Sequence, residues 1–423
     1  MTDTDRSYDI VVWGATGFAG RLVSDYLTQQ YTPDGVSLAL GGRSEARLDT
    51  LESELVAQSE AWDSIPTVLG DAMEPESLRE MARRTHVVCT TVGPYTTYGT
   101  PLVEACVAAG TEYCDLTGEI NWVRETVDRF HDAAVDADTR IVHSCGFDSV
   151  PADIGTLLVQ SFAAREFDTH CGLVRIYIDE ASGGVSGGTL ASFGELFDAA
   201  SNDPVTRQTL ENPYSLAPPG ERDGVDPGAQ RRPRKDRLRS VWTAPSPMAP
   251  VNERVVRRSN ALLGYPWGRE FRCTEVIPTG SGVSGAAGAG AIAGGVGLFT
   301  AAMSIDPVRA GVRRFVFPDP GEGPTRAQVE NGSFTVRVLG RGTGTDGPFT
   351  AEAEFSASLD PGYGATARML AETAMCLRQE DTESPAAGGV LTPASGVGEP
   401  LARRLRDVGF TITVDERTER SGV

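Results

Sequence analysis

Short β-rich runs alternate with longer amphipathic stretches over the first 155 residues of the chain. Runs of β-branched and aromatic residues predict strands at 8–13, 36–40, 67–69, 86–91, 112–115 and 140–143. Between them, apolar residues recur at helical spacing and predict helices at 21–30, 47–58, 74–84, 101–109 and 121–137. Strands that alternate with helices in this way form βαβ units. The sequence therefore predicts an α/β fold that begins with a Rossmann-type, doubly wound parallel sheet.

The pattern changes in the second half of the chain. Residues 332–339 and 350–358 alternate apolar and polar positions and predict paired antiparallel strands, with a turn region at 340–347. Residues 366–379 predict a helix with one apolar face that packs in a core. Repeated prolines and glycines at 202–250 predict a long loop or lid with little regular structure.

Residues 276–305 carry no charge and are rich in glycine and alanine. The length suits a membrane span, but glycines weaken both a helix and its insertion into a bilayer. Three interpretations stay open: a buried helix or glycine-rich lid lining an acyl tunnel, a shallow contact with a membrane or lipid surface, and a transmembrane helix. We favour the first.

Composition narrows the function classes. The chain has 38 basic and 58 acidic side chains, a net charge of −20, which argues against nucleic-acid partners and general binding to anionic membranes. Lys235 is the only lysine, and an acid excess with so little lysine is expected of a halophilic protein kept soluble in concentrated salt.

The cysteines and the N-terminal segment bear on the compartment. Seven cysteines without a CxxC pair and four histidines without ligand spacing predict neither disulfides nor a metal site. The acidic start of the chain is unlike a secretory signal. We expect a cytoplasmic protein, with membrane association through 276–305 left open.

A glycine-rich turn follows the first predicted strand directly. Its spacing, GxxGxxG, departs from the GxGxxG of the standard dinucleotide fingerprint, yet it opens a helix as that fingerprint does. Glycines at these places permit a tight turn and let the backbone approach a pyrophosphate at the helix N-terminus. The turn residues predicted to contact a cofactor are Gly14, Ala15, Thr16, Gly17, Phe18 and Gly20.

The end of the second strand indicates which dinucleotide is bound. No acidic residue stands where a ribose 2′-hydroxyl would be recognised, and Arg43 and Ser44 suit a 2′-phosphate instead. The alternative is a solvated surface arginine. We predict NADP(H) in preference to NAD(H).

The ends of the third and fourth strands add further candidates. Asp71 either accepts from the adenine amine or caps the helix that follows it. Val92, Gly93 and Pro94 bring the chain close to the ligand at the carboxyl edge of the sheet. Tyr95 and Tyr98 then lie near the expected nicotinamide, although a structural aromatic explains either tyrosine equally well.

Two more segments place polar groups at the same edge. They are residues 113–119, which read YCDLTGE, and residues 144–153, which read SCGFDSVPAD. They add Tyr113 and Asp148 to the catalytic candidates, while Asp153 either orients such groups or caps a helix.

A basic cluster lies within the long loop. Arg231–Arg239 hold six cations and one acid, locally +5 against the overall field. The cluster is either a solvated loop or a docking site for a phosphate-bearing partner, such as coenzyme A or a carrier-protein arm.

Taken together, the motifs GATGFAGRL, GGR, TTVGPY, YCDLTGE and CGFDSVPAD resemble those of the saccharopine dehydrogenase-like oxidoreductases. The resemblance is closest to the branch of the trans-acting enoyl reductases, and residues 320–324, 360–363, 366–370 and 388–393 agree with it. It implies an NADP-binding Rossmann domain at 1–155, an α+β substrate domain at 156–360, and a segment at 361–423 that packs back on the first domain.

What the resemblance implies about activity is reduction of a C=C bond in a lipid-like or thioester-linked substrate. Such a reaction needs a proton donor and hydrogen-bond donors for an enolate oxygen, for which Tyr95, Tyr98, Tyr113 and Asp148 are candidates. Two alternatives stay open: a saccharopine-type dehydrogenase acting on a C–N bond, and a non-catalytic NADP(H) sensor. We expect a homodimer.

Overall fold

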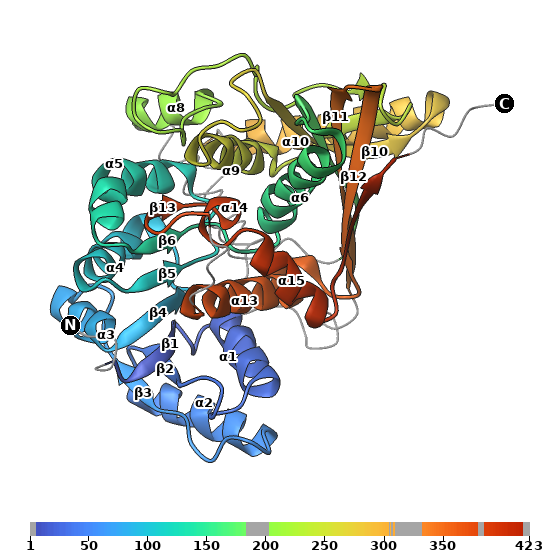
Figure 1. Ribbon diagram of the computed structural model, residues 1–423. Coiled ribbons are helices and arrows are strands. Elements are labelled where there is room, and N and C mark those ends of the chain that lie inside the picture. The colour runs from blue at the N-terminus through green and yellow to red at the C-terminus, as the bar shows by residue number, and fades with distance from the viewer. Residues whose placement is uncertain are drawn as a thin grey trace.

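Two seven-stranded sheets, one parallel and one mixed, form the molecule (Figure 1). The structure is a computed structural model that describes residues 6–182, 203–303, 305, 308, 332–379 and 385–417. The predicted motif at 320–324 lies outside these residues.

The first sheet has the strand order β3-β2-β1-β4-β5-β6-β13, and every pair in it is parallel. The chain crosses from one side of the sheet to the other between β3 and β4, so the loops after β1 and β4 form a topological switch point. The predicted Rossmann-type fold is confirmed. Its strands are β1 (Tyr8–Trp13), β2 (Leu38–Gly42), β3 (Thr67–Leu69), β4 (Thr85–Thr90), β5 (Glu112–Cys114), β6 (Arg140–Val142) and β13 (Gly389–Leu391).

Helices cover both faces of this sheet. The apolar faces of α1 and α2 belong to one hydrophobic core, and those of α3, α4 and α5 belong to another. These helices are α1 (Phe18–Gln30), α2 (Glu45–Gln58), α3 (Pro75–Arg83), α4 (Tyr95–Ala109) and α5 (Ile120–Asp136). Most bounds lie within a few residues of the predicted ones, but α4 begins at Tyr95 rather than at residue 101.

The second sheet has the order β14-β12-β11-β7-β10-β9-β8, in which only β7 and β10 pair in parallel among the described strands. The β11–β12 hairpin is longer than predicted, because most of the expected turn region at 340–347 is strand. The strands are β7 (Leu173–Ser182), β8 (Arg234–Lys235), β9 (Trp242–Pro245), β10 (Arg272–Gly280), β11 (Ser333–Gly344), β12 (Gly347–Ala357) and β14 (Thr411–Glu416).

Two helices connect the sheets: α6 (Val150–Phe167) and α9 (Ala249–Leu262). Helix α6 packs on β11 and β12 so closely that a Cβ on Gly155 would lie 2.7 Å from Val338 Cγ2. The predicted boundary at residue 155 therefore falls inside a helix that already belongs to the second sheet, and the chain leaves the first domain near residue 150.

The segment after residue 360 serves both domains. The short π-helical turn η2 (Pro361–Ala365) leads into α13 (Thr366–Arg378), which packs on α1, β1, β4 and β5. The buried Glu372 carboxylate accepts from Tyr26 Oη and Tyr31 Oη, both at 2.6 Å, and thereby ties α13 to the first domain.

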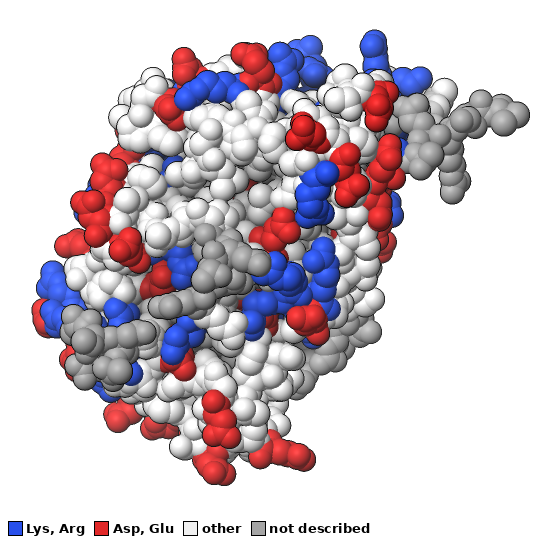
Figure 2. All heavy atoms as spheres, viewed as in Figure 1, with Lys and Arg blue, Asp and Glu red and all other residues white. Residues whose placement is uncertain are grey.

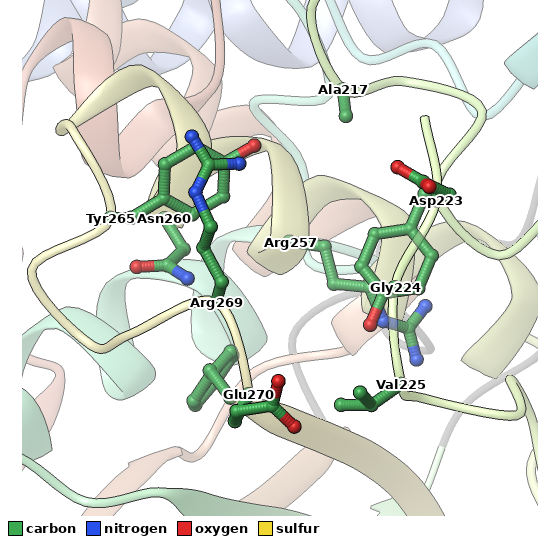
Figure 3. Close-up of a pocket in the computed structure, with 11 residues that line it drawn as sticks. Ala217, Asp223, Gly224, Val225, Arg257, Asn260, Tyr265, Arg269 and Glu270 are labelled. Carbon is green, nitrogen blue, oxygen red and sulfur yellow. The ribbon is translucent and has the colours of Figure 1, made fainter. Parts of the chain in front are cut away.

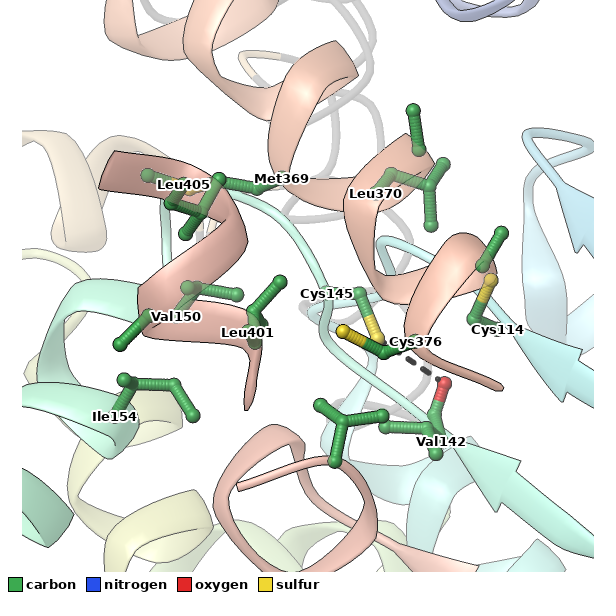
Figure 4. Packing of buried hydrophobic residues seen from close by; sticks show 14 of the residues in the cluster. Cys114, Val142, Cys145, Val150, Ile154, Met369, Leu370, Cys376, Leu401 and Leu405 are labelled. Carbon is green, nitrogen blue, oxygen red and sulfur yellow. Dashed lines mark hydrogen bonds between the residues drawn. The ribbon is translucent and has the colours of Figure 1, made fainter. Parts of the chain in front are cut away.

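The end of the described chain departs from the prediction. After α14 (Pro393–Gly396) and α15 (Glu399–Asp407), β14 pairs with β12 at the edge of the second sheet. The expectation that 361–423 packs back on the first domain does not hold for this strand, because the open edge of β12 offers backbone hydrogen bonds. Figure 4 shows α13 and α15 contributing Met369, Leu370 and Leu401 to a core shared with Val150 and Ile154 of α6.

The predicted irregular loop at 202–250 contains regular structure in its described part. Helix α8 (Pro204–Glu211) and strands β8 and β9 lie within it. Three buried arginines of α9 hold the intervening chain by donating to carbonyl oxygens: Arg254 to Leu210 and Asn212, Arg257 to Pro213, and Arg258 to Leu216. Contacts from residues some 40 positions away hold these elements, so local composition does not predict them.

The uncharged segment forms the end of β10 and the helix α10 (Gly282–Met303). Of the residues of α10, only Gly285, Ala289 and Met303 are buried. The interpretation as a buried helix is wrong, since most of its surface faces outward. By length and composition α10 is the one described helix that is long and apolar enough to cross a membrane.

Candidate active site

The glycine turn after β1 is closely packed on all sides. Gly14 has a φ of +88°, and a Cβ there would lie 2.6 Å from Val92 Cγ2. A Cβ on Gly20 would lie 2.1 Å from Gly14 O, so α1 sits directly on the turn. The amides of Gly14 and Ala15 donate to Gly41 O at 3.0 and 3.1 Å, which fixes the turn against β2. Larger side chains would move α1 away from the sheet edge.

The N-terminus of α1 is open to an anion. Gly17 stands at the N-cap, no side chain caps the helix, and no acidic residue lies in its first turn. The first backbone N–H groups of a helix need acceptors, and a phosphate supplies them. Thr16 and Phe18 are half-buried beside this end, and the Phe18 ring packs edge-on against Tyr363 at 4.7 Å between centroids.

Arg43 and Ser44 follow β2 as predicted for a 2′-phosphate site. Arg43 is exposed, and no ion pair or hydrogen bond of its side chain is found among the described residues. Ser44 is the N-cap of α2, and its hydroxyl makes no capping bond. Arg47, one turn later, donates to Thr16 O at 3.1 Å and adds a cation between the two turns. Sequence analysis missed Arg47, whose i+4 spacing from Arg43 was the available signal.

Asp71 organises the turn before α3. Its Oδ1 accepts from the Met73 amide at 2.8 Å, and Glu74, not Asp71, is the N-cap of α3. The helix-capping interpretation is wrong, because the chain makes this extra turn first. Recognition of adenine by Asp71 stays a prediction.

The loop after β4 lies beside the glycine turn. The Thr91 amide donates to Trp13 O at 3.0 Å, and the Val92 amide donates to Thr90 Oγ1 at 3.2 Å. These bonds place Val92, Gly93 and Pro94 at the switch point between β1 and β4. Tyr98, in the first turn of α4, is half-buried.

Tyr95 is part of the core. Its ring stacks on Trp122 at 5.4 Å between centroids, and its hydroxyl donates to Thr90 O at 3.2 Å. Burial raises the pKa of Tyr95 well above its usual value. The stacking on Trp122 and the hydrogen bond to Thr90 O support the alternative of a structural aromatic, and proton donation by Tyr95 stays an untested prediction.

Glu119 explains why α4 starts where it does. Its buried carboxylate accepts from the amides of Tyr95 and Thr96 at 2.9 and 2.7 Å and from Thr96 Oγ1. A carboxylate at this place satisfies N-terminal amides and complements the helix dipole. The loop after β5 thereby holds the loop after β4.

Tyr113 lies in a second buried network. Its hydroxyl donates to Asp115 Oδ2 at 2.9 Å, and the same oxygen lies 2.7 Å from His143 Nδ1. The other ring nitrogen of His143 lies 3.0 Å from Thr126 Oγ1. Burial raises the pKa of Tyr113 well above its usual value. The prediction that Tyr113 donates a proton to substrate does not fit this geometry, because its hydroxyl is fully enclosed and already donates to Asp115.

Asp148 stands where the two domains meet. It is half-buried at the start of α6, and its charge acts on Glu275 of β10. Glu275 is fully buried and accepts from Ser246 Oγ at 2.5 Å and Asn252 Nδ2 at 2.6 Å. Burial, and to a lesser degree nearby acidic charge including Asp148, raises the pKa of Glu275 to about 7. Glu275 is not among the residues predicted above, since a single acid within an apolar strand gives no local signal.

A separate cavity of about 180 Å³ lies within the second domain. Figure 3 shows Tyr265 and Arg269 on one wall, with the guanidinium 3.9 Å from the ring centroid, and Asp223 to Val225 on the facing wall. No residue of the first sheet lines it, so it is not part of the nucleotide crevice.

The comparisons with known proteins agree with this geometry. Residues 10–142 match the family described as the saccharopine dehydrogenase NADP binding domain. The glycine turn, the uncapped α1 and the exposed Arg43 fit such a cofactor, so NADP(H) is the cofactor of this chain.

Curated relatives match over nearly the whole chain. A Mycobacterium tuberculosis protein provisionally named a trans-acting enoyl reductase is 40% identical over 427 residues, which cover 97% of this chain and 98% of the relative. The trans-acting enoyl reductase of Mycobacterium ulcerans is 36% identical over 424 residues, covering 98% and 99%.

Solved structures support the fold. Saccharopine dehydrogenase (L-Glu forming) from Saccharomyces cerevisiae superposes with a TM-score of 0.53 at 12% identity, covering 97% of this chain and 100% of that one. The protein is an NADP-dependent oxidoreductase, which sets aside a non-catalytic sensor. The chain belongs to the saccharopine dehydrogenase-like oxidoreductases, in the branch of the trans-acting enoyl reductases.

Proposed function

We propose that the protein uses NADPH to reduce the C=C bond of a lipid-like, thioester-linked enoyl substrate. The observation that carries the proposal is the 36–40% identity, over nearly the full length, to proteins named trans-acting enoyl reductases. The second domain is included in that identity, and the substrate has to meet the cofactor between the two domains.

Binding of the cofactor falls to the first domain. The glycine turn and the open N-terminus of α1 bind the diphosphate, and Arg43 with Ser44 binds the 2′-phosphate. When bound, NADPH supplies a hydride for the β-carbon of the enoyl group. The half-buried Val92 and Pro94 shield that end of the crevice from water.

Two tasks remain for the chain's own groups: stabilising the enolate oxygen and delivering a proton to the α-carbon. With Tyr95 and Tyr113 engaged in the core, the half-buried Tyr98 and Asp148 are the predicted catalytic residues that remain as candidates. The acid with the raised pKa is Glu275, through burial first and then through the charges of Glu253 and Asp148. We assign proton delivery to Asp148, because it is only half-buried whereas Glu275 is fully buried, with Glu275 as a positioning residue.

The test is an assay of the purified protein with NADPH and a series of trans-2-enoyl-CoA esters of increasing chain length. NADPH oxidation and the saturated product, identified by mass spectrometry, are expected to increase with chain length. Turnover of saccharopine with NADP⁺, in the absence of enoyl reduction, would overturn the proposal in favour of the amino-acid dehydrogenase.

The assignment of Asp148 has its own variant. Asp148→Asn is expected to lower kcat by about 100-fold, the usual contribution of a general acid, with NADPH affinity unchanged. Glu275→Gln is expected to shift the pH profile of kcat with a smaller loss. The matched control is Asp63→Asn, an exposed acid of the first domain that should behave as wild type. A kcat for Asp148→Asn equal to that of the control would remove Asp148 from the reaction.

A further inference from the structure

Helix α10 is apolar on every side, yet most of it faces outward. Residues 282–303 contain no charged side chain, and the exposed fraction is 88% at Val283 and 74% at Leu298. At Gly290, Gly294, Gly295 and Gly297, apart from the backbone of α10 itself, no atom of the described residues lies within 4 Å of the place where a Cβ would stand. A helix that is hydrophobic all round is usually buried in a protein core or in lipid. The described part of the chain provides no such core for it.

An exposed cationic segment, which includes β8, lies at the edge of the second sheet, and α10 packs on two strands of the same sheet. Arg231, Arg232, Arg234, Lys235 and Arg237 are all exposed. The single acid within 231–239, Asp236, is buried and forms an ion pair with Arg175 of β7. The exposed charged side chains of residues 231–239, called the cationic edge of β8 below, are therefore all positive.

Contacts through β9 join the cationic edge of β8 to α10. Lys235 pairs with Trp242 in the β8–β9 ladder. The hydroxyl of Thr279 lies 3.1 Å from Trp242 O and 2.8 Å from Gly285 O, in the first turn of α10. Since neighbouring strands are about 4.8 Å apart, the cationic edge and the start of α10 are separated by about two strand spacings.

We propose that α10 and the cationic edge of β8 dock the protein on an anionic phospholipid membrane. The helix lies in the boundary between headgroups and acyl chains, and the cations of β8 contact lipid phosphates. The rest of the chain carries the acid excess behind the net charge of −20, and on the face that Figure 2 shows acidic side chains are interspersed with basic ones. Repulsion of that acid excess orients the molecule with the docking face toward the lipid.

Other occupants explain only part of the surface. A coenzyme A or carrier-protein phosphate would account for the cations but not for the exposed apolar helix. A second copy of the chain would cover the helix. A two-fold interface uses the same surface of both subunits, however, so the cations of both subunits would meet there and repel each other.

The test is flotation of the full-length protein with phosphatidylcholine vesicles, with and without an equal share of phosphatidylglycerol. Binding is expected only with phosphatidylglycerol and should weaken as salt is raised. Leu298→Glu with Phe299→Glu should lower the vesicle-bound fraction at least about tenfold, because charged groups would enter the acyl boundary. Arg234→Gln with Lys235→Gln should lower the binding constant about 30-fold, from about 1 kcal/mol per basic residue.

Matched controls lie on the first domain. Leu69→Glu with Met73→Glu changes side chains that are 59% and 64% exposed, and Arg79→Gln with Arg83→Gln removes two exposed cations. Both double variants should bind vesicles as wild type does. Thermal unfolding of every variant checks that it is folded.

Four results would overturn the proposal. The first is equal binding to both kinds of vesicle, and the second is a protein that leaves membranes only when detergent is added. The third is that no vesicle binding is seen and the Leu298 and Phe299 variant loses a dimer that the wild type forms. The fourth is that the β8 variant changes only the KM for CoA-linked substrates. The readout is vesicle binding, so failure of this proposal leaves the proposed function untouched, and the reverse also holds.

Discussion

Two stretches of this chain are rich in glycine, and their glycines serve different purposes. At Gly14 and Gly20 a Cβ would lie 2.6 and 2.1 Å from neighbouring atoms, so no other residue fits. At Gly290 and Gly294 of α10 nothing described lies within 4 Å. In the first stretch a close approach of backbone atoms requires glycine, whereas in the second stretch glycine only lowers helix propensity. The spacing of the glycines does not distinguish the two stretches. The predicted strand before the glycine turn and the predicted helix after it do distinguish them.

The sharpest way to break this comparison is Gly14→Ala. The positive φ and the contact with Val92 should each lower the free energy of unfolding by about 1–3 kcal/mol, and because the turn has to shift, NADPH affinity is expected to fall at least about tenfold. Fluorescence titration with NADPH measures the loss, and thermal unfolding monitors the fold. An unchanged Kd would mean that the turn does not bind the cofactor.

The junction between the two domains can be tested through Asp153. This buried acid of α6 accepts from Ser259 Oγ and from the Ala394 amide, and burial raises its pKa from 3.8 to about 6. A raised folded-state pKa means that the native state binds the extra proton between pH 4 and 6. The contribution of Asp153 to stability is therefore complete below about pH 4 and is lost as the pH rises through 6.

The variant Asp153→Asn removes this titration. From a shift of about two units, the difference in unfolding free energy between wild type and variant should fall by about 3 kcal/mol from pH 4 to pH 7. Urea unfolding at both pH values gives the difference. A difference that stays constant with pH would show that Asp153 does not titrate as its burial predicts.

The two sets of exposed arginines can be compared in the same way. Arg43→Ala should weaken NADPH binding about 30-fold, for a lost charge-assisted contact of about 2 kcal/mol, and leave NADH binding unchanged. The matched control, Arg234→Ala in the cationic edge of β8, should alter neither. Equal losses for NADPH and NADH in Arg43→Ala would argue against contact with the 2′-phosphate.

The smallest effect is expected in α10. Gly290→Ala should raise the free energy of unfolding by up to about 1 kcal/mol, because alanine favours the helix and meets open space. Denaturant unfolding measures it, with Gly14→Ala as the contrasting substitution. A destabilisation at Gly290 would show that α10 is packed against something in solution.

The local pattern predicts much of the first domain. The strand at 67–69 is β3 itself, and Met369, Leu370, Thr373 and Leu377 of α13 are buried, although every residue from Met369 to Leu377 is buried and not one face alone. These elements are fixed by residues within a few positions of one another, so periodicity is sufficient.

The missed features depend on distant partners. Helix α4 starts at Tyr95 because Glu119 accepts from its first amides. Tyr95 is a core residue because Trp122 stacks on it. Glu275 becomes part of the junction only when β10 meets α9 and the segment just before α6. Neither composition nor spacing around any of these residues carries that information.

The carboxylate of Glu119 also bears on which way round a dinucleotide would bind. Two helices, α1 and α4, begin at the switch point, and both would attract a phosphate group. Because α4 already holds an anion of the protein's own, an incoming diphosphate finds vacant amides only at α1. The amides of α1 would therefore hold the diphosphate, and this would fix the polarity in which the dinucleotide binds.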